Sequence, residues 1–211
     1  MKKAQPCQRV GSPDDFQSPA CALDPLYPYL NPNWTIWEPA AGKGNLVRAL
    51  WDRDYGWGVV ASDILERGTI EFDCGTYKPR EELDFLDGDL EDDEYDAVIT
   101  NPPFSHKDEF LARCYEIGKP FSLLMPLTAL EGIERQRLYR SFGVEVIILP
   151  RRLNFETPSG NGSGSWFATA WYTWGLNIGS ALTFWEGPPG WGLKTKSSAS
   201  PVSLFDSAAA L

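Results

Sequence analysis

The alternation of short apolar runs with amphipathic stretches is the feature of this 211-residue sequence that most constrains its fold. Such an alternation is typical of a parallel sheet that is covered by helices and buried on both faces. We therefore expect an α/β domain built on a doubly wound, mostly parallel sheet. The expected strands are 34–38, 58–62, 95–100, 121–125 and 144–149, and the expected helices are near 46–51, 107–118 and 133–142.

The two ends of the sequence differ in composition from this middle part. Residues 1–33 are rich in proline and polar side chains, with a short helix expected around 20–30. After Pro150, a glycine- and serine-rich loop at 159–165, expected to be flexible, precedes an aromatic run at 166–174 that we expect to close the sheet. We predict an N-terminal segment (1–33), one domain (34–186) and a flexible C-terminal tail (187–211).

Composition excludes several classes of protein. At 43% hydrophobic residues the chain has enough apolar side chains for a core, so it is not intrinsically disordered. It contains no apolar run long enough to span a membrane, and its N-terminus lacks the apolar stretch of a secretory signal. The four cysteines are scattered and His106 is the single histidine, which argues against a zinc site or a disulfide framework. We expect no metal, no membrane association and a cytoplasmic location.

Charge is distributed unevenly along the chain. The net charge is −10, and ten acidic residues without a single base lie between Glu81 and Asp96. The other 19 acids balance the 19 bases, and residues 119–152 carry six bases against three acids. A polyanion can therefore meet a mildly basic face while the acidic segment lies elsewhere. Two ordinary solvated faces explain the same pattern, so charge alone does not identify a partner.

The first chemical signal is a glycine loop between a strand and a helix. Glu38-Pro39-Ala40-Ala41-Gly42-Lys43-Gly44 follows the first expected strand, and Asp63 ends the second. Ligands bind at the carboxyl ends of strands in doubly wound sheets, and an acid at the end of the second strand suits the hydroxyls of a ribose. The loop is not G-x-G-x-x-G, and the charge of Glu38 attracts a cation. These features indicate an adenosine-containing cation rather than a pyrophosphate.

The second chemical signal is the tetrapeptide Asn101-Pro102-Pro103-Phe104, which directly follows an apolar strand. The two prolines fix φ and remove two backbone donors, leaving carbonyl acceptors. The Asn101 amide adds a further acceptor, and the Phe104 ring adds a flat apolar face. This combination suits a planar ring that carries an exocyclic NH2 group.

In this order, the two signals resemble class I S-adenosylmethionine-dependent amino-methyltransferases of the N6-adenine and N4-cytosine branch. The resemblance extends over about 16–174 and implies a Rossmann-like, seven-stranded sheet with an antiparallel final strand. It implies cofactor binding by Asn101 and by the following residues: Phe16, Gln17, Ser18, Pro19, Glu38, Pro39, Ala40, Gly42, Gly44, Asp63, Ile64, Asp84 and Phe85. It also implies a catalytic Asn101-Pro102-Pro103-Phe104 and substrate binding by Phe104, Phe155, Arg151 and Arg152. For the acid that binds the cofactor adenine, Asp87 and Asp89 are alternatives to Asp84.

The resemblance implies an enzyme that uses S-adenosylmethionine to methylate the N6 amine of adenine in DNA, with flipping of the target base. Members of this family usually carry a separate target-recognition domain after the catalytic core, and we expect none here, because only about 37 residues follow Trp174. The candidate recognition elements are 127–140 and 151–165. We therefore expect short or relaxed sequence specificity, as in solitary phage enzymes, and a monomer or weak dimer in a bacterial or phage-infected cell.

Several alternatives remain open at the level of the sequence. The target can be the N4 amine of cytosine in DNA or the N6 amine of adenine in RNA. A glutamine side chain of a protein and the N2 amine of guanine in ribosomal RNA fit less well, because those enzymes usually have a different glycine loop and an additional N-terminal domain. A catalytically silent binding module is the alternative outside enzymes, and an NAD(P)-dependent oxidoreductase leaves Asn101–Phe104 without a role.

Overall fold

A mixed sheet of eight strands forms the centre of the molecule. The computed structural model describes residues 14, 16–52, 58–73, 75–88, 90–157, 160–161, 167–189 and 191. The order of the strands across the sheet is β12 (Leu182–Phe184), β8 (Glu145–Ile148), β11 (Thr169–Trp174), β7 (Phe121–Pro126), β6 (Ala97–Thr100), β1 (Thr35–Glu38), β2 (Gly58–Asp63) and β5 (Arg80–Glu81). Only β11 runs antiparallel to its neighbours. The expected α/β class with a mostly parallel, doubly wound sheet is thereby confirmed.

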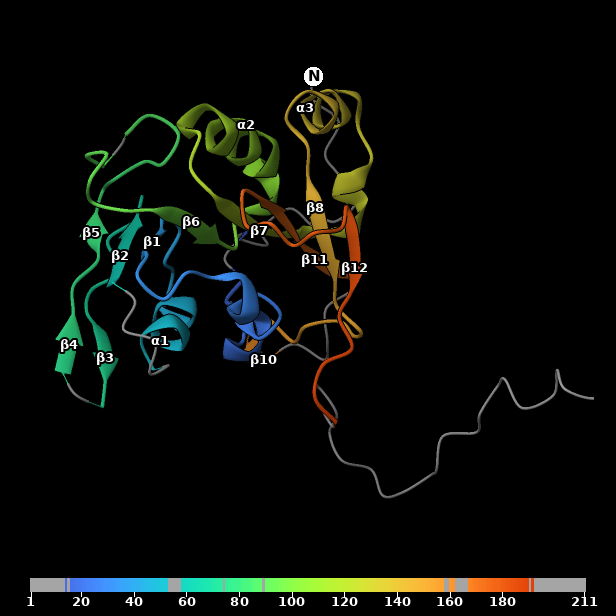
Figure 1. The fold of residues 1–211 in the computed structure, drawn as a ribbon. Coiled ribbons are helices and arrows are strands. Elements are labelled where there is room, and N and C mark those ends of the chain that lie inside the picture. The colour runs from blue at the N-terminus through green and yellow to red at the C-terminus, as the bar shows by residue number, and fades with distance from the viewer. Residues whose placement is uncertain are drawn as a thin grey trace, which may run out of the picture.

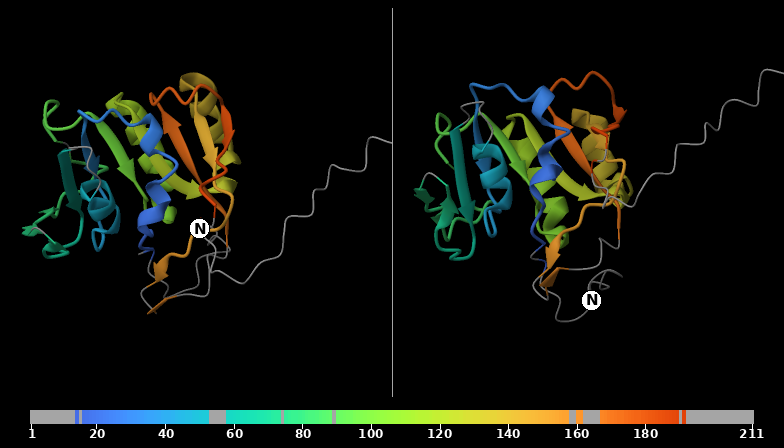
Figure 2. Two further views of the ribbon diagram at one scale, coloured as in Figure 1. Left: turned by 60° about the horizontal axis from the view of Figure 1, so that its bottom comes forward. Right: turned by 90° about the horizontal axis from the view of Figure 1, so that it is seen from below.

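Helices cover the sheet from two sides (Figure 1). The helices α2 (Lys107–Ile117) and α3 (Ile133–Phe142) lie on one side, and α1 (Asn45–Trp51) lies on the other. Beside α1 lie the 3-10 helices η1 (Ala20–Leu23) and η2 (Tyr27–Tyr29), so the N-terminal segment forms part of this second layer (Figure 2). Two further 3-10 helices, η3 (Phe104–His106) and η4 (Leu127–Leu130), precede α2 and α3.

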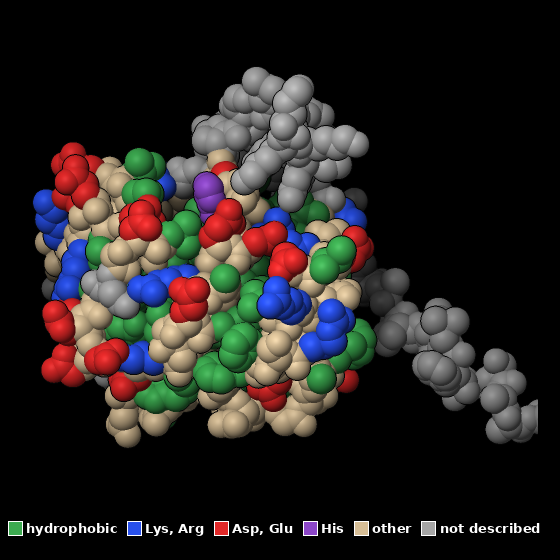
Figure 3. Space-filling model, turned by 90° about the horizontal axis from the view of Figure 1, so that it is seen from above, with side chains coloured by type: hydrophobic (Ala, Val, Ile, Leu, Met, Phe, Trp, Pro, Cys, Tyr) green, Lys and Arg blue, Asp and Glu red, His purple; other side chains and the backbone are tan. Residues whose placement is uncertain are grey.

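The side of the molecule that carries α2 and α3 has a mixed surface. Figure 3 shows basic, acidic and hydrophobic side chains interspersed on this side. Helix α3 contributes no buried side chain, its Arg137 pairs with Glu134 at 3.7 Å, and Ile133 is 82% exposed. The basic residues of α3 are therefore partly neutralised by the one acid of this helix, Glu134.

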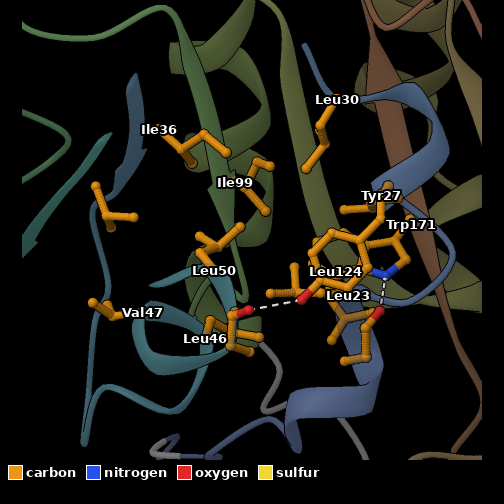
Figure 4. Packing of buried hydrophobic residues seen from close by; sticks show 14 of the residues in the cluster. Leu23, Tyr27, Leu30, Ile36, Leu46, Val47, Leu50, Ile99, Leu124 and Trp171 are labelled. Atoms are coloured by element: carbon orange, nitrogen blue, oxygen red, sulfur yellow. Dashed lines mark hydrogen bonds between the residues drawn. The ribbon is translucent and has the colours of Figure 1, made fainter. Parts of the chain in front are cut away.

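Two apolar clusters lie on the two faces of the sheet, because successive side chains of a strand point to opposite faces. Ile36 of β1 and Ile99 of β6 belong to the cluster beneath α1, η1 and η2, whereas their neighbours Trp37 and Val98 belong to the cluster beneath α2. Figure 4 shows how the first cluster is tied to the N-terminal segment. The following hydrogen bonds fix it: the Tyr27 hydroxyl donates to the Ala49 carbonyl at 2.8 Å, and Trp171 Nε1 donates to the Ala22 carbonyl at 2.6 Å.

The structure differs from the sequence-based expectations in four places. The sheet has eight strands rather than seven, because β12 adds an edge strand beyond β8. The antiparallel strand β11 is accordingly not the last one. A hairpin of β3 (Ile70–Phe72) and β4 (Gly75–Tyr77) connects β2 to β5. The single helix expected around 20–30 is wrong: Pro25 and Pro28 interrupt it, and two 3-10 helices form instead.

The predicted loop at 159–165 lies mostly outside the described residues, and within it Gly160–Asn161 forms β10, paired with β9 (Glu156–Thr157). The predicted tail, 187–211, is described only at 187–189 and 191. Among the described residues, no helix combines the length and the apolar character needed to cross a membrane.

Candidate active site

A cavity of about 460 Å³ lies where the carboxyl ends of three parallel strands meet. Strand β1 pairs with β2 on one side and with β6 on the other, so Glu38, Asp63 and Asn101 converge at one edge of the sheet. Most of the predicted site residues line this cavity: Phe16, Gln17, Ser18, Glu38, Pro39, Ala40, Gly42, Asp63, Ile64, Asp84, Phe85, Asn101 and Pro103. Seven predicted site residues lie outside this lining: Pro19, Gly44, Pro102, Phe104, Arg151, Arg152 and Phe155.

The glycine loop owes its glycines to backbone geometry and to close packing. Gly42 and Gly44 have φ values of +54° and +82°, a region that side chains other than glycine rarely adopt. A Cβ atom on Gly42 would lie 2.5 Å from Gln17 Oε1, and one on Gly44 would lie 2.5 Å from the Ile70 side chain. Gly44 caps α1 rather than facing the cavity. The two positions thus require glycine for different reasons: Gly42 packs against Gln17 in the cavity wall, whereas Gly44 packs against Ile70 at the start of α1.

Glu38 is buried at the bottom of the cavity, with 1% of its surface exposed. Its Oε1 accepts hydrogen bonds from Thr100 Oγ1 at 2.5 Å and from the Ala40 backbone N–H at 3.0 Å. Its Oε2 is buried without a hydrogen-bond partner among the described residues. Burial raises the pKa of Glu38 to about 8, although the hydrogen bond from Thr100 opposes this shift. An empty cavity therefore holds Glu38 largely protonated at neutral pH.

Asp63, at the end of β2, holds the glycine loop in place. Its Oδ2 accepts the Gly42 N–H at 2.8 Å and pairs with Arg67 Nε at 3.1 Å, and its Oδ1 accepts the Leu65 N–H at 2.9 Å. A carboxylate offers about four acceptor positions, so about one remains for a ligand. The next residue, Ile64, is more than half exposed and lines the cavity as an apolar wall.

Asp84 and Phe85 form the wall on the side of the acidic segment. Asp84 Oδ1 accepts the Leu86 N–H at 2.9 Å, and Phe85 is buried against Trp37 and Phe110. Of the two alternatives, Asp87 is exposed and not part of the lining, and Asp89 lies outside the described residues. The geometry therefore favours Asp84 over Asp87.

Asn101 follows β6 and presents one of its two polar atoms to the cavity. Its Nδ2 donates to the Phe16 carbonyl at 2.8 Å, while its Oδ1 is buried without a partner among the described residues. Pro102 is buried behind it, and Pro103 lines the cavity. The Asn101 amide is thus oriented with its acceptor free.

Phe104 is not the open stacking surface that the sequence indicates. Its side chain is 9% exposed and packs against three other rings, Phe16, Phe155 and Phe167. The ring of Phe16 is stacked on it, with centroids 5.8 Å apart and planes inclined by 24°. Any planar group that stacks on Phe104 must therefore displace one of these rings. Phe155, which the sequence analysis assigned to substrate binding, thus lies against Phe104 outside the cavity lining, and Phe167 is a further ring of this cluster that the sequence analysis did not assign.

The N-terminal segment connects the glycine loop to the loop that follows β8. The backbone of Gln17 forms two hydrogen bonds of 3.0 Å with that of Glu156, and Gln17 Oε1 accepts the Lys43 N–H at 2.7 Å. The Ser18 hydroxyl is buried on the cavity wall without a partner among the described residues. Pro19 lies outside the lining and precedes η1. Three segments that are distant in sequence therefore meet at Gln17.

The structure separates the two predicted arginines from the cavity and adds residues that the sequence analysis missed. Arg151 and Arg152 are exposed on the loop after β8 and line no part of the cavity. Asp14 and His106 do line it. Lys107 is 5% exposed, and its Nζ donates to the Phe104 carbonyl at 3.2 Å. From the sequence alone this lysine would be taken for a surface residue, because nothing local indicates its burial.

Among the residues that the structure describes, no group of three or more His, Cys, Asp or Glu side chains is placed to hold a metal ion. The polar atoms of the cavity that lack partners are instead all oxygens, on Ser18, Glu38 and Asn101. The site thus presents acceptors to a ligand that brings donors or positive charge.

No protein-family model matches this chain, and no curated protein matches it. Solved structures do. The methyltransferase subunit of a type I restriction-modification system from Streptococcus thermophilus matches with a TM-score of 0.51 at 15% identity, over 78% of this chain and 45% of the other. A modification subunit of a putative type I restriction enzyme from Vibrio vulnificus YJ016 matches with a TM-score of 0.47 at 14% identity, over 75% of this chain and 44% of the other. The chain spans less than half the length of either subunit, and at this identity the likeness concerns the fold.

Proposed function

We propose that this protein is an S-adenosylmethionine-dependent methyltransferase that modifies the exocyclic N6 amine of adenine in DNA. The observation that carries the proposal is the placement of three buried oxygens on the walls of one cavity, Ser18 Oγ, Glu38 Oε2 and Asn101 Oδ1, none of which has a hydrogen-bond partner in the described part of the chain. Buried acceptors without hydrogen bonds are costly, so their concentration in one cavity indicates a ligand that satisfies them. The Rossmann-like fold shared with the Streptococcus thermophilus methyltransferase subunit agrees with this proposal.

The residues of the cavity fit S-adenosylmethionine, which combines positive charge, a ribose and an adenine. Glu38 Oε2 accepts from the aminoacyl ammonium, and the hydroxyl of Ser18 binds the same end of the molecule. The free acceptor position of Asp63 binds a ribose hydroxyl. Asp84 accepts from the adenine amine, while the side chains of Ile64 and Phe85 contact the adenine ring. When bound, this cofactor supplies an electrophilic methyl group on a sulfonium.

Asn101 and Pro102 hold the amine that receives the methyl group. Asn101 Oδ1 accepts one hydrogen of the amine. The Pro102 carbonyl accepts the other in this proposal, although Pro102 itself lies outside the cavity lining, and the two contacts direct the nitrogen lone pair away from both oxygens. Pro103 has no N–H, so the Pro102 carbonyl has no donor in its own peptide unit. The protein thereby contributes mainly alignment, and the methylated amine loses its proton to solvent without a dedicated base.

A base within a duplex does not reach this cavity, so the target base has to flip out of the stack at a cost of a few kcal/mol. In the structure, Phe16 occupies one face of Phe104. We expect the flipped base to take over contacts within the cluster of Phe16, Phe104, Phe155 and Phe167. This cluster is apolar, so it forms no hydrogen bond with a base edge by itself. Because the cluster contributes no contact that distinguishes one base from another, we expect short or relaxed sequence specificity.

The experiment that tests this proposal offers the protein labelled S-adenosylmethionine together with DNA, RNA or protein as separate acceptors. Mass spectrometry of the modified nucleosides then identifies the atom that carries the label. We expect N6-methyladenine in DNA. N4-methylcytosine in DNA or N6-methyladenine in RNA would reassign the substrate, and label in a protein glutamine or in guanine N2 would reassign the enzyme class.

Asn101→Ala serves as the matched control for this experiment. We expect it to lower turnover at least about 100-fold, the scale on which the loss of one transition-state contact acts, while cofactor binding stays nearly unchanged. A wild-type protein that binds the cofactor but labels none of the acceptors would instead be a silent binding module. An equal loss of binding and turnover in Asn101→Ala would mean that Asn101 supports the fold rather than the reaction.

A further inference from the structure

The orientation of the Asn101 amide is set by a backbone group of the N-terminal segment. Asn101 Nδ2 lies 2.8 Å from the carbonyl oxygen of Phe16, 85 residues earlier in the sequence. A carbonyl oxygen only accepts hydrogen bonds, so the amide must present its NH2 group to it. As a result, Oδ1 faces the cavity, where it has no partner among the described residues.

The Phe16 carbonyl is itself held firmly. One of the two backbone hydrogen bonds between Gln17 and Glu156 fixes the peptide unit that carries this carbonyl, because the Gln17 N–H that donates to the Glu156 carbonyl belongs to it, and the second fixes the next peptide unit. The Gln17 side chain is tied to the glycine loop through the Lys43 N–H. On the other side of the carbonyl, the Phe16 ring packs against Phe104. The acceptor opposite Asn101 therefore has little freedom to move away.

We propose that the backbone carbonyl of Phe16 is a positioning group, which orients the Asn101 amide for the substrate amine and requires asparagine rather than aspartate at position 101. This inference rests on the proposed function, since it assigns the orientation of the side chain that accepts from the amine. The Asn101 NH2 group satisfies the carbonyl, and Oδ1 remains free for the substrate. An ionised aspartate has no donor to offer.

The chemistry of an Asn101→Asp substitution follows directly. The ionised carboxylate places an oxygen opposite the Phe16 carbonyl oxygen, and two acceptors at hydrogen-bond distance repel each other. The protonated carboxyl donates its O–H to Phe16 and leaves its second oxygen where Oδ1 stood. Only the protonated variant therefore keeps the arrangement of the wild type, and its activity falls as the pH rises through the pKa of the new carboxyl group.

Other titratable groups surround position 101 and also respond to pH. Those that line the same cavity are Asp14 of the N-terminal segment, Glu38 of β1, Asp63 of β2 with its partner Arg67, Asp84 of the loop after β5, and His106 of η3. All of them are present in both proteins. The ratio of the variant's kcat to the wild-type kcat at each pH therefore isolates the group at position 101.

The test measures kcat of the full chain and of Asn101→Asp between pH 5 and pH 9, with S-adenosylmethionine and DNA saturating. We expect the ratio of the two kcat values to be highest at low pH and to fall about tenfold per pH unit above the pKa of the carboxyl group. A matched pair, Phe16→Leu with and without Asn101→Asp, keeps the carbonyl and removes the ring, and it should show the same slope.

Two results would overturn the inference: a ratio that does not change with pH, whatever its size, and a ratio that rises with pH. If the variant does not fold, a measurement on the wild type takes the place of this test. The hydrogens of the Asn101 side-chain NH2 should then exchange with solvent more slowly than those of the exposed Asn33 side chain. Equal exchange rates would contradict the hydrogen bond to Phe16. If the wild type itself transfers no methyl group, the proposed function fails; if it does and the ratio is flat, only this inference fails.

Discussion

Glu38 and Asn101 expose one oxygen each to the cavity because another atom of the same side chain is held. Glu38 Oε1 is fixed by Thr100 and Ala40, which leaves Oε2, and Asn101 Nδ2 is fixed by Phe16, which leaves Oδ1. Thr100 and Asn101 are adjacent in sequence, so the end of β6 supplies both the hydrogen bond that fixes Glu38 and the Asn101 amide itself. Both oxygens are therefore held in position before a ligand binds, which lowers the entropic cost of binding it.

The raised pKa of Glu38, about 8, predicts that cofactor affinity depends on pH. A cationic ligand favours the ionised carboxylate, so below pH 8 binding has to remove a proton from Glu38. The apparent affinity should therefore rise about tenfold per pH unit from pH 6 towards pH 8, and it should fall again at higher pH, where the α-ammonium of the ligand loses its own proton. Calorimetric titrations of S-adenosylmethionine at several pH values, in buffers of different ionisation enthalpy, measure both the affinity and the released proton.

Glu38→Gln is the control for this prediction. It keeps the shape of the side chain but has no proton to release, so we expect a weaker affinity, by about tenfold to a hundredfold at pH 8, that no longer follows this slope. The same slope in the variant would place the titrating group elsewhere in the cavity.

Asp84 and Asp87 form a natural pair for testing which acid of the acidic segment contacts the cofactor. Asp84 lines the cavity and Asp87 does not. We expect Asp84→Ala to weaken S-adenosylmethionine binding about tenfold or more, because a hydrogen bond to a charged group is lost, and Asp87→Ala to leave it unchanged. Calorimetry on the two variants, after a comparison of their thermal unfolding, decides between them. Loss of affinity in Asp87→Ala alone would reject the assignment of Asp84.

At the level of elements, the glycine loop depends on the N-terminal segment that packs over it. Gly42→Ala forces a side chain into a left-handed backbone and displaces the Gln17 amide from Lys43. We expect the free energy of unfolding to fall by about 1–3 kcal/mol, and cofactor affinity to fall with it. Urea unfolding of the variant measures the first effect, and calorimetry measures the second.

Gly68→Ala is the matched control, since Gly68 also has a positive φ, +72°, but a Cβ there meets no atom within 4 Å. The difference between the two variants isolates the contact with Gln17. If both lose the same stability, that contact contributes nothing beyond the backbone strain.

Most elements that end in a strong local signal could be predicted from the sequence. Strand β6 is stopped by Pro102 and Pro103, and β1 by Pro39 and the glycine loop, so the predicted ends agree with the structure within about a residue. The three-residue strands β3, β4 and β12 are too short for an alternating pattern, and their pairing depends on contacts distant in sequence. The single helix predicted around 20–30 was wrong, because Pro25 and Pro28 cannot donate the backbone hydrogen bonds that a continuous α-helix needs there.

The candidate site was likewise predictable only in part. The motifs at the ends of β1, β2 and β6 were predictable, because parallel strands bring their carboxyl ends together. The burial of Lys107 and the hydrogen bond from Asn101 to the Phe16 carbonyl were not. A backbone carbonyl has no sequence signature, and the contact joins residues 85 positions apart. The stacking of Phe16 on Phe104 was not predictable either, because it also joins residues that are distant in the sequence.

For the molecule as a whole, the surface limits what the protein can recognise. The side with α2 and α3 mixes charges of both signs (Figure 3). Arg151 and Arg152 are exposed but lie outside the cavity lining. Each specific base contact discriminates by about 1–3 kcal/mol, so the few candidate elements of the described chain support only a short site. We expect genome-wide mapping of methylated positions in cells that express the protein to give a consensus of about four base pairs or fewer. A longer, strictly kept consensus would contradict this account.

The central claim is that the cavity at the carboxyl ends of β1, β2 and β6 binds S-adenosylmethionine. Calorimetric titration of the full chain at pH 8 tests it most directly. The account predicts one bound molecule per chain, with nearly the same affinity in Asn101→Ala and a clearly weaker one in Glu38→Gln. A folded protein that takes up no S-adenosylmethionine, or one whose binding is indifferent to Glu38, would contradict it.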